Sequence, residues 1–142
     1  MPSGSVPTGL RILVAEDTAP NQVLITRLLA KQGHQPTLAR DGAEAVELFQ
    51  LDAFDLVLMD RHMPRMDGLE ATRQIRLLEQ TRPSSARRIP IIALTAETQA
   101  EETNTYADAG IDDVLLKPFF AQQLRDMVAR WCANTAAAGF SP

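Results

Sequence analysis

The sequence predicts an α/β fold: a three-layer, doubly wound, five-stranded parallel sheet with helices on both faces. Two observations carry this prediction. Short apolar runs recur along the chain, and each is continuous rather than alternating, which is typical of strands covered on both faces. Segments with helical periodicity lie between these runs, and strands that alternate with helices favour right-handed crossovers and a parallel sheet.

Five segments are expected to form the strands. Four are clear apolar runs, at 12–15, 56–59, 91–94 and 114–116. A fifth, weaker strand is expected around 36–39. Because the four clear runs have no polar side, we expect them to be buried on both faces.

End signals locate the helices between these strands. The first helix is expected to begin at Pro20, which suits the first helical position, and to end at Gly33. The second begins at an Asp41 cap, and the third follows Asp67-Gly68. The faces expected to be buried are Leu24, Leu28 and Leu29 in the first helix, Ala45, Val46 and Phe49 in the second, Leu69, Thr72 and Ile75 in the third, and Phe120, Leu124, Met127, Val128 and Trp131 in the last.

The helical segment at 98–109 differs from the others. It is rich in polar residues, which leave only Ala100, Tyr106 and Ala107 as apolar anchors. We therefore expect a helix that is weakly held to the rest of the fold.

The bulk composition indicates one domain and excludes several functional classes. The chain has 142 residues and a net charge of -4, so it offers no basic face for direct nucleic-acid binding. No apolar stretch is long enough to insert into a membrane. Its single cysteine, Cys132, has no partner for an internal disulfide, which fits a cytoplasmic location. We expect a flexible segment at 1–9, a domain at 10–132 and a flexible tail or linker at 133–142.

Charged residues follow the predicted strands at the same end. Glu16 and Asp17 follow the first strand, Asp60 follows the third, and Lys117 follows the last. Open α/β sheets place ligand sites at the carboxyl ends of their strands, so these side chains should converge. Three acids and a lysine in one place imply a cation and an anion bound together, as in metal-assisted phosphoryl transfer.

A divalent cation would relieve the repulsion among these acids. Two carboxylates about 4 Å apart repel by about 4 kcal/mol at an effective dielectric constant of about 20. Mg²⁺ suits a cluster whose only nearby nitrogen ligand is His62. Thr95 directly follows a strand and should point into the same crevice, although a helix cap is an equally good use of it. The plain alternatives are a helix cap and a solvated acid for Glu16 and Asp17, a loop turn for Asp60, and a solvated surface residue for Lys117.

Four motifs in order resemble the receiver domain of two-component response regulators, over roughly residues 10–132. They are Glu16-Asp17, Met59-Asp60-x-x-Met63-Pro64-x-Met66-Asp67-Gly68, Leu94-Thr95-Ala96 and Lys117-Pro118-Phe119. Finer segments are similar to receivers attached to hybrid histidine kinases: Pro20-Asn21-Gln22, Ile89-Pro90-Ile91-Ile92-Ala93-Leu94-Thr95-Ala96 and Gly110-Ile111-Asp112-Asp113. The resemblance implies a flavodoxin-like sheet with the strand order 2-1-3-4-5.

The resemblance also implies roles for these residues. Asp60 would accept a phosphoryl group from a phosphohistidine on a histidine kinase or a histidine phosphotransfer domain, or on a kinase core in the same polypeptide. Asp17, Asp60 and the His62 backbone carbonyl would hold Mg²⁺, with Mn²⁺ as a substitute, and Glu16 would act through a bound water. Lys117 would neutralise a phosphoryl oxygen and Thr95 would hydrogen-bond another, pulling its loop inward as a conformational switch. Such a domain catalyses only its own phosphorylation and dephosphorylation, so it is not an enzyme in the ordinary sense.

Two departures from the family pattern keep another function open. Val114 stands where receivers often carry an aromatic switch residue, three positions before the lysine. Arg61 and His62 are larger and more basic than is common, and Arg61 either influences the phosphate or is a solvent-exposed side chain without consequence. The alternative is a receiver-fold docking module with weakened or lost switching. An aspartyl-nucleophile phosphatase would need an Asp-x-Asp that Glu16-Asp17-Thr18 does not supply.

Overall fold

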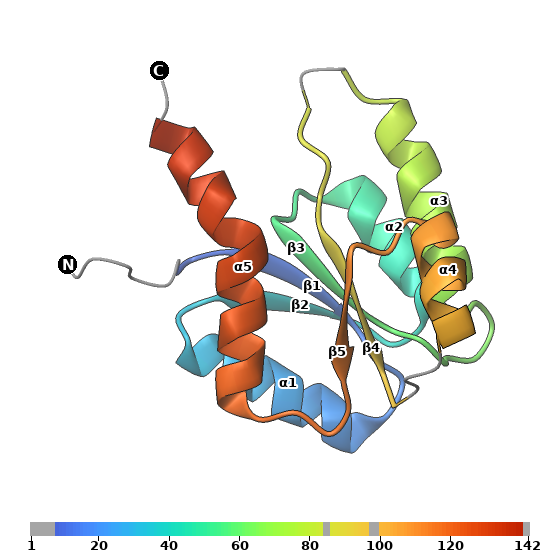
Figure 1. Cartoon of the computed structure of the whole chain (residues 1–142), viewed down its shortest axis with the longest axis horizontal. Helices are drawn as coiled ribbons and strands as arrows, with labels where there is room; N and C mark the ends of the chain where they lie inside the picture. Colours follow the sequence, from blue (N-terminus) through green and yellow to red (C-terminus); the bar gives the residue numbers. More distant parts are fainter. Residues whose placement is uncertain (1–7, 84–85, 97–99, 141–142) are drawn as a thin grey trace.

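The computed structural model describes the backbone of residues 8–83, 86–96 and 100–140, and the side chains of 8–83, 86–96 and 105–132. Its centre is a five-stranded parallel sheet in the order β2-β1-β3-β4-β5 (Figure 1). The strands are β1 (Arg11–Ala15), β2 (Gln35–Ala39), β3 (Leu56–Asp60), β4 (Ile91–Thr95) and β5 (Asp113–Leu116). The predicted fold and strand order are confirmed, and each strand lies within one residue of its predicted position.

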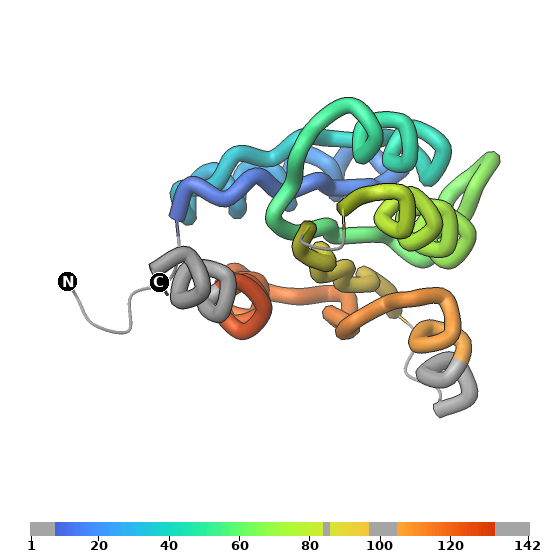
Figure 2. Tube along the Cα trace, turned by 90° about the horizontal axis from the view of Figure 1, so that it is seen from above, coloured from blue at the N-terminus to red at the C-terminus, as the bar shows by residue number. Residues whose placement is uncertain are grey.

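The helices form a layer on each face of this sheet (Figures 1 and 2). They are α1 (Ala19–Lys31), α2 (Gly42–Leu51), α3 (Gly68–Gln80), α4 (Ala100–Ala109) and α5 (Ala121–Phe140). One apolar cluster joins the sheet to α1 and α5, through side chains such as Ile25, Leu29, Leu124 and Val128. A second joins the opposite face to α2, α3 and α4, through Phe49, Ile75 and Tyr106 among others.

Side-chain caps begin two of the helices, and the cap at Asp41 was predicted from the sequence. Asp41 accepts a hydrogen bond from the backbone nitrogen of Glu44 at the start of α2 (2.9 Å). Asp67 accepts one from Glu70 at the start of α3 (2.9 Å). In α3, the Thr72 hydroxyl donates to the carbonyl of Gly68 (2.7 Å), so this polar residue is buried with its hydrogen bond made.

Some predicted faces are wrong in detail. Leu24 is 48% exposed, because the buried stripe of α1 runs through Ile25 and Leu29, one position further along the helix. Phe120 is 75% exposed, because it precedes the first residue of α5 and lies outside the helical repeat. In α4, Ala107 is exposed, and Ala109 packs into the core with Tyr106 instead.

The chain ends were assigned from composition alone. The helix α5 continues to Phe140, so a helix covers most of the segment predicted as a tail. Its alanines at 136–138 explain this, since alanine is the best helix former. Most of the predicted lead-in, residues 1–7, falls outside the described residues, as do 97–99 of the predicted fourth helix. The division at 9/10 and 132/133 stays a prediction. No helix in the described part of the chain is long and apolar enough to cross a bilayer.

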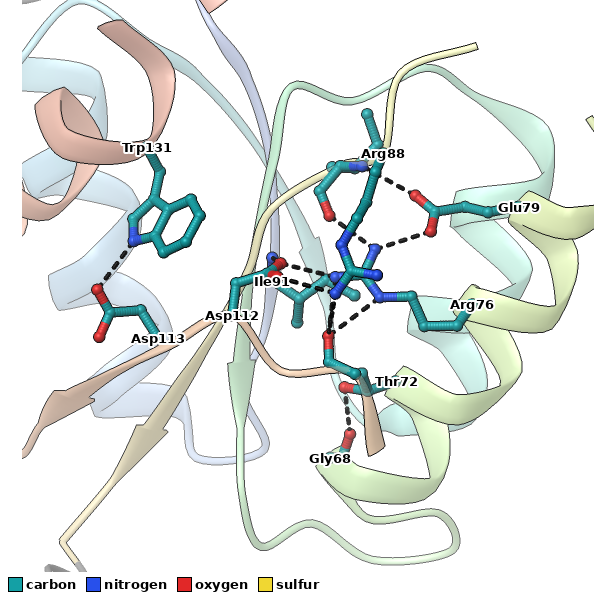
Figure 3. Close-up of polar contacts among 11 residues, drawn as sticks. Gly68, Thr72, Arg76, Glu79, Arg88, Ile91, Asp112, Asp113 and Trp131 are labelled. Atoms are coloured by element: carbon teal, nitrogen blue, oxygen red, sulfur yellow. Dashed lines mark hydrogen bonds and ion pairs between the residues drawn. The ribbon is translucent and has the colours of Figure 1, made fainter. Parts of the chain in front are cut away.

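A buried arginine joins three elements at the amino-terminal edge of β4 (Figure 3). The side chain of Arg76, in α3, is 11% exposed and pairs with Asp112 and Glu79, each at 2.7 Å. Asp112 also accepts the backbone N–H of Ile91 (2.8 Å), and Glu79 accepts that of Ile89 (2.9 Å). This network therefore fixes α3 against β4 and against the loop that leads into β5.

Candidate functional site

The predicted acids meet at the carboxyl edge of the sheet. Glu16 and Asp17 follow β1, and Asp60 is the last residue of β3, the strand that pairs with β1. Carboxylate oxygens of these three residues lie within 4.8 Å of one another. Glu16 and Asp60 are buried, whereas Asp17 is exposed to solvent. The convergence inferred from strand order is thus present in the structure.

Lys117 bridges the two buried acids. Its Nζ lies 3.0 Å from Asp60 Oδ1 and 3.2 Å from Glu16 Oε1, and 24% of its side chain is exposed. It directly follows β5, and its backbone nitrogen donates to the carbonyl of Thr95 (2.8 Å), the last residue of β4. Thr95 is buried at this edge, beside the lysine backbone. The peptide bond between Lys117 and Pro118 is cis.

Glu16 is surrounded by hydrogen-bond donors. Its Oε2 accepts from the backbone nitrogen (3.2 Å) and the hydroxyl (3.0 Å) of Thr18. The amide of Gln22 donates to its backbone carbonyl (2.7 Å). Burial raises the pKa of Glu16, but the charge of Lys117 and the hydrogen bonds from Thr18 outweigh burial, so the pKa is lower than usual. Glu16 is therefore a stable anion.

Asp60 is the acid of the cluster whose ionised form is least favoured. Burial is the main cause that raises its pKa, from 3.8 to about 6. The negative charges of Glu16 and Asp17 raise it further, and the hydrogen bond and charge of Lys117 lower it. Burial lowers the pKa of Lys117, but Asp60 and Glu16 outweigh that effect and the pKa is raised, so the lysine is a permanent cation. One lysine does not balance three acids.

This donor set fits a hard divalent cation. The three acids offer oxygen ligands only, and they form the one such acidic group found among the described side chains. Mg²⁺ binds one or two carboxylates and keeps several waters, which the exposed position of Asp17 allows. Burial and the charges of Glu16 and Asp17 raise the pKa of Asp60, and a bound cation would offset the repulsion between these charges. The side chain of His62 is exposed and takes no part in the acidic group.

The loop that follows Asp60 is fixed by an ion pair that the sequence did not reveal. Arg65 has a positive φ of 66°, which is unfavourable for a residue with a Cβ. Its Nε and Nη2 both donate to Asp41 Oδ2, at 2.8 and 2.5 Å. Asp41 was predicted only as a helix cap, so it has two roles. Where the loop ends, a Cβ on Gly68 would overlap the carbonyl oxygen of Asp60, and only glycine permits this close approach.

The two departures from the family pattern lie close to each other in the structure. Arg61 is not the solvent-exposed side chain that one reading of the sequence allowed, because only 16% of it is exposed. Its guanidinium lies 5.8 Å from the centre of the Tyr106 ring, in α4. Val114 is partly buried and packs against the same apolar cluster as Tyr106.

Known proteins share this sequence pattern. The profile of the response regulator receiver domain matches residues 12–129. The sensor protein GacS of Pseudomonas syringae pv. syringae is 41% identical over 121 residues, which are 85% of this chain and 13% of that protein. Response regulator MprA of Mycolicibacterium vanbaalenii is 40% identical over 115 residues, 81% of this chain and 47% of that protein. The chain thus spans less than half the length of these relatives.

Solved structures share the fold as well. The receiver domain of a sensor histidine kinase from Pseudomonas aeruginosa, described with a magnesium ion in its active-site cleft, has 37% identity and a TM-score of 0.77, over 89% of this chain and 99% of that one. A Saccharomyces cerevisiae receiver domain, in complex with a histidine phosphotransfer protein, has 28% identity and a TM-score of 0.87, over 96% and 98%. Sequence, fold and the acids at the sheet edge agree, and the chain belongs to the response regulator receiver domain family.

Proposed function

We propose that Asp60 is the phosphoacceptor of this receiver domain. The observation that carries the proposal is its carboxylate, which is buried beside two other acids and 3.0 Å from the Nζ of Lys117. In the transfer, an oxygen of Asp60 attacks the phosphorus of a phosphohistidine on the partner. The phosphorus–nitrogen bond breaks, and its electron pair goes to the imidazole nitrogen. The domain itself then carries an aspartyl phosphate and acts on no separate substrate.

The surrounding side chains stabilise the transferred charge. Lys117 already lies against the oxygen of Asp60, so its charge is next to the oxygens that arrive with the phosphoryl group. Thr95 ends the neighbouring strand and would donate its hydroxyl to a second phosphoryl oxygen. Positioning and charge stabilisation supply the catalysis, since the phosphoryl-transfer transition state needs little covalent help.

The acidic cluster would hold Mg²⁺. Asp17 and Asp60 would be direct ligands, the His62 backbone carbonyl a third, and Glu16 would act through a water. Mn²⁺ prefers the same oxygen ligands and would substitute. The ion would shield the negative charge shared by the acids and the phosphoryl oxygens.

The partner would be a histidine kinase or a histidine phosphotransfer domain in the cytoplasm, on a separate chain or in the same polypeptide. The similarity to a sensor protein and to a receiver in complex with a phosphotransfer protein supports this. An exposed apolar surface lies next to Lys117: Val23 and Leu24 are each 48% exposed, and a hollow of about 350 Å³ separates Leu24 from Lys117. We place the histidine-bearing helix of the partner over this surface.

The test is phosphorylation by a small phosphodonor. The chain is incubated with Mg²⁺ and acetyl phosphate, and its mass is measured. We expect one phosphoryl group on the wild type, none on Asp60→Asn, and one on the control Asp108→Asn, which changes an exposed acid in α4. Failure of the wild type to gain this mass, or an equal gain by Asp60→Asn, would instead support the docking module.

A further inference from the structure

Arg61 turns toward α4 rather than to solvent. Its guanidinium lies 5.8 Å from the centre of the Tyr106 ring, which is within the range of a cation–π interaction. Its Nη1 is 3.4 Å from Oδ2 of Asp67, the N-cap of α3. The side chain next to the phosphoacceptor thus contacts both helices that flank the loop.

The backbone of Arg61 is held in place. Its nitrogen donates to the carbonyl of Leu94 in β4 (3.0 Å), and its carbonyl accepts from Gly68 at the start of α3 (3.1 Å). When the charge at Asp60 changes, we therefore expect the side chain of Arg61 to move while its backbone stays in place. Arg61 directly follows Asp60, the last residue of β3, so its side chain leaves the backbone one residue from the proposed phosphoacceptor.

Tyr106 is placed to move when this contact changes. Its side chain is 4% exposed, and its hydroxyl is buried without a hydrogen-bond partner among the described residues. Beside the ring lies a hollow of about 200 Å³, bounded on the β5 side by Asp113 and Val114. Within the described part of the chain no hydrogen bond from the hydroxyl fixes the ring, and Val114 lines the hollow next to it.

We propose that Arg61 couples phosphorylation of Asp60 to α4 by releasing Tyr106. The phosphoryl group brings about two negative charges and three acceptor oxygens. A charge-assisted hydrogen bond to these oxygens is stronger than the cation–π contact with the Tyr106 ring. Arg61 therefore moves from the ring to the phosphoryl group, and Tyr106 shifts into the hollow beside Val114. Arg61 and Tyr106 are positioning residues of the switch, and the inference rests on Asp60 as the phosphoacceptor.

The chain contains a single tyrosine, so the proposal can be tested at one site. Growth with 3-fluorotyrosine labels Tyr106 alone, and its ¹⁹F resonance is recorded before and after acetyl phosphate with Mg²⁺. Mass spectrometry on the same samples gives the phosphorylated fraction. We expect a second resonance whose intensity follows that fraction.

Variants separate this coupling from a purely structural role. Arg61→Met keeps the bulk of the side chain without its charge, and we expect it to be phosphorylated while the second resonance is lost. Arg61→Lys restores the charge and should restore part of the response. Val114→Phe fills the hollow and should also abolish the second resonance in a folded, phosphorylated protein.

The outcomes are distinguishable. If the wild type gains no phosphoryl mass, the proposed function fails, and the coupling fails with it. If the mass appears but the Tyr106 resonance does not change, or changes equally in Arg61→Met, the coupling through Arg61 is refuted and the phosphoacceptor role stands.

Discussion

Replacing Asp60 by asparagine should stabilise the metal-free protein. The carboxyl has a pKa of about 6 in the folded chain, against 3.8 when it is unperturbed. Each unit of difference corresponds to about 1.4 kcal/mol, so ionised Asp60 destabilises the fold by up to about 3 kcal/mol at pH 7. Asparagine has the same shape without the charge, but it also loses the ion pair with Lys117. We therefore expect a net gain of about 1–3 kcal/mol, which raises the melting temperature by about 3–10 °C in a domain of this size.

The sign of the effect also fixes its pH dependence. Because the folded pKa of Asp60 is higher than the unfolded value, folding favours the protonated acid. Well below pH 3.8 the carboxyl is protonated in both states and the penalty is absent. The penalty grows as the pH rises toward 6 and is complete above it. The difference in melting temperature between Asp60→Asn and the wild type should therefore be larger at pH 7 than at pH 4 and should vanish well below pH 3.8.

Differential scanning calorimetry with and without Mg²⁺ tests this reasoning. Mg²⁺ should raise the melting temperature of the wild type, since it binds the folded state alone, and should have little effect on Asp60→Asn. Asp17→Asn is the matched control: Asp17 is exposed, so this variant should lose the Mg²⁺ response with little change in metal-free stability. A metal-free melting temperature of Asp60→Asn that is unchanged or lowered at pH 7 would refute the electrostatic account of the site.

Three further predictions concern positions outside the acidic cluster. Arg76→Met should lower the free energy of unfolding in urea by about 3 kcal/mol, because it leaves the largely buried Glu79 without its cation and leaves Asp112 paired with the exposed Arg88; Arg73→Met, on the exposed side of the same helix, should lower it by less than about 1 kcal/mol. Gly68→Ala should cost about 1–3 kcal/mol in the same assay and weaken Mg²⁺ binding measured by calorimetry, because the added methyl group displaces the carbonyl of Asp60. Burial lowers the pKa of His34 from 6.5, so stability should be full above pH 6.5 and fall below it as the unfolded state takes up a proton. His34→Asn should remove this component from a pH series of urea unfolding curves, and an unaltered pH profile would contradict it.

Strand positions and the convergence of the acids follow from local features of the sequence. A continuous apolar run is enough to place a buried strand, and parallel strands bring their carboxyl ends to one edge whatever the loops contain. Asp17, Asp60 and Lys117 could therefore be brought together from their places after three runs. The cap at Asp41 was equally local, since a cap depends on the next few residues.

Side-chain contacts between distant segments could not be predicted in this way. Arg65 pairs with Asp41 across 24 residues, and Arg76 pairs with Asp112 across 36, and nothing in the local pattern selects these partners. The exposure of Leu24 depends on how α1 is rotated against the sheet. The direction of Arg61 likewise depends on where α4 packs, which is a property of the tertiary structure.

The different surroundings of two neighbouring acids favour Asp60 over Glu16 as the proposed nucleophile. Both contact Lys117, but Glu16 also accepts two hydrogen bonds from Thr18, and its pKa falls. Burial raises the pKa of Asp60 to about 6, and Lys117 is the hydrogen-bond donor that the described residues give to its carboxylate. A carboxylate with fewer donors is the more basic of the two and the better nucleophile, and it gains more from an added cation. The fold thus stabilises the charge of Glu16 and raises the pKa of Asp60, as the proposed phosphoacceptor role requires.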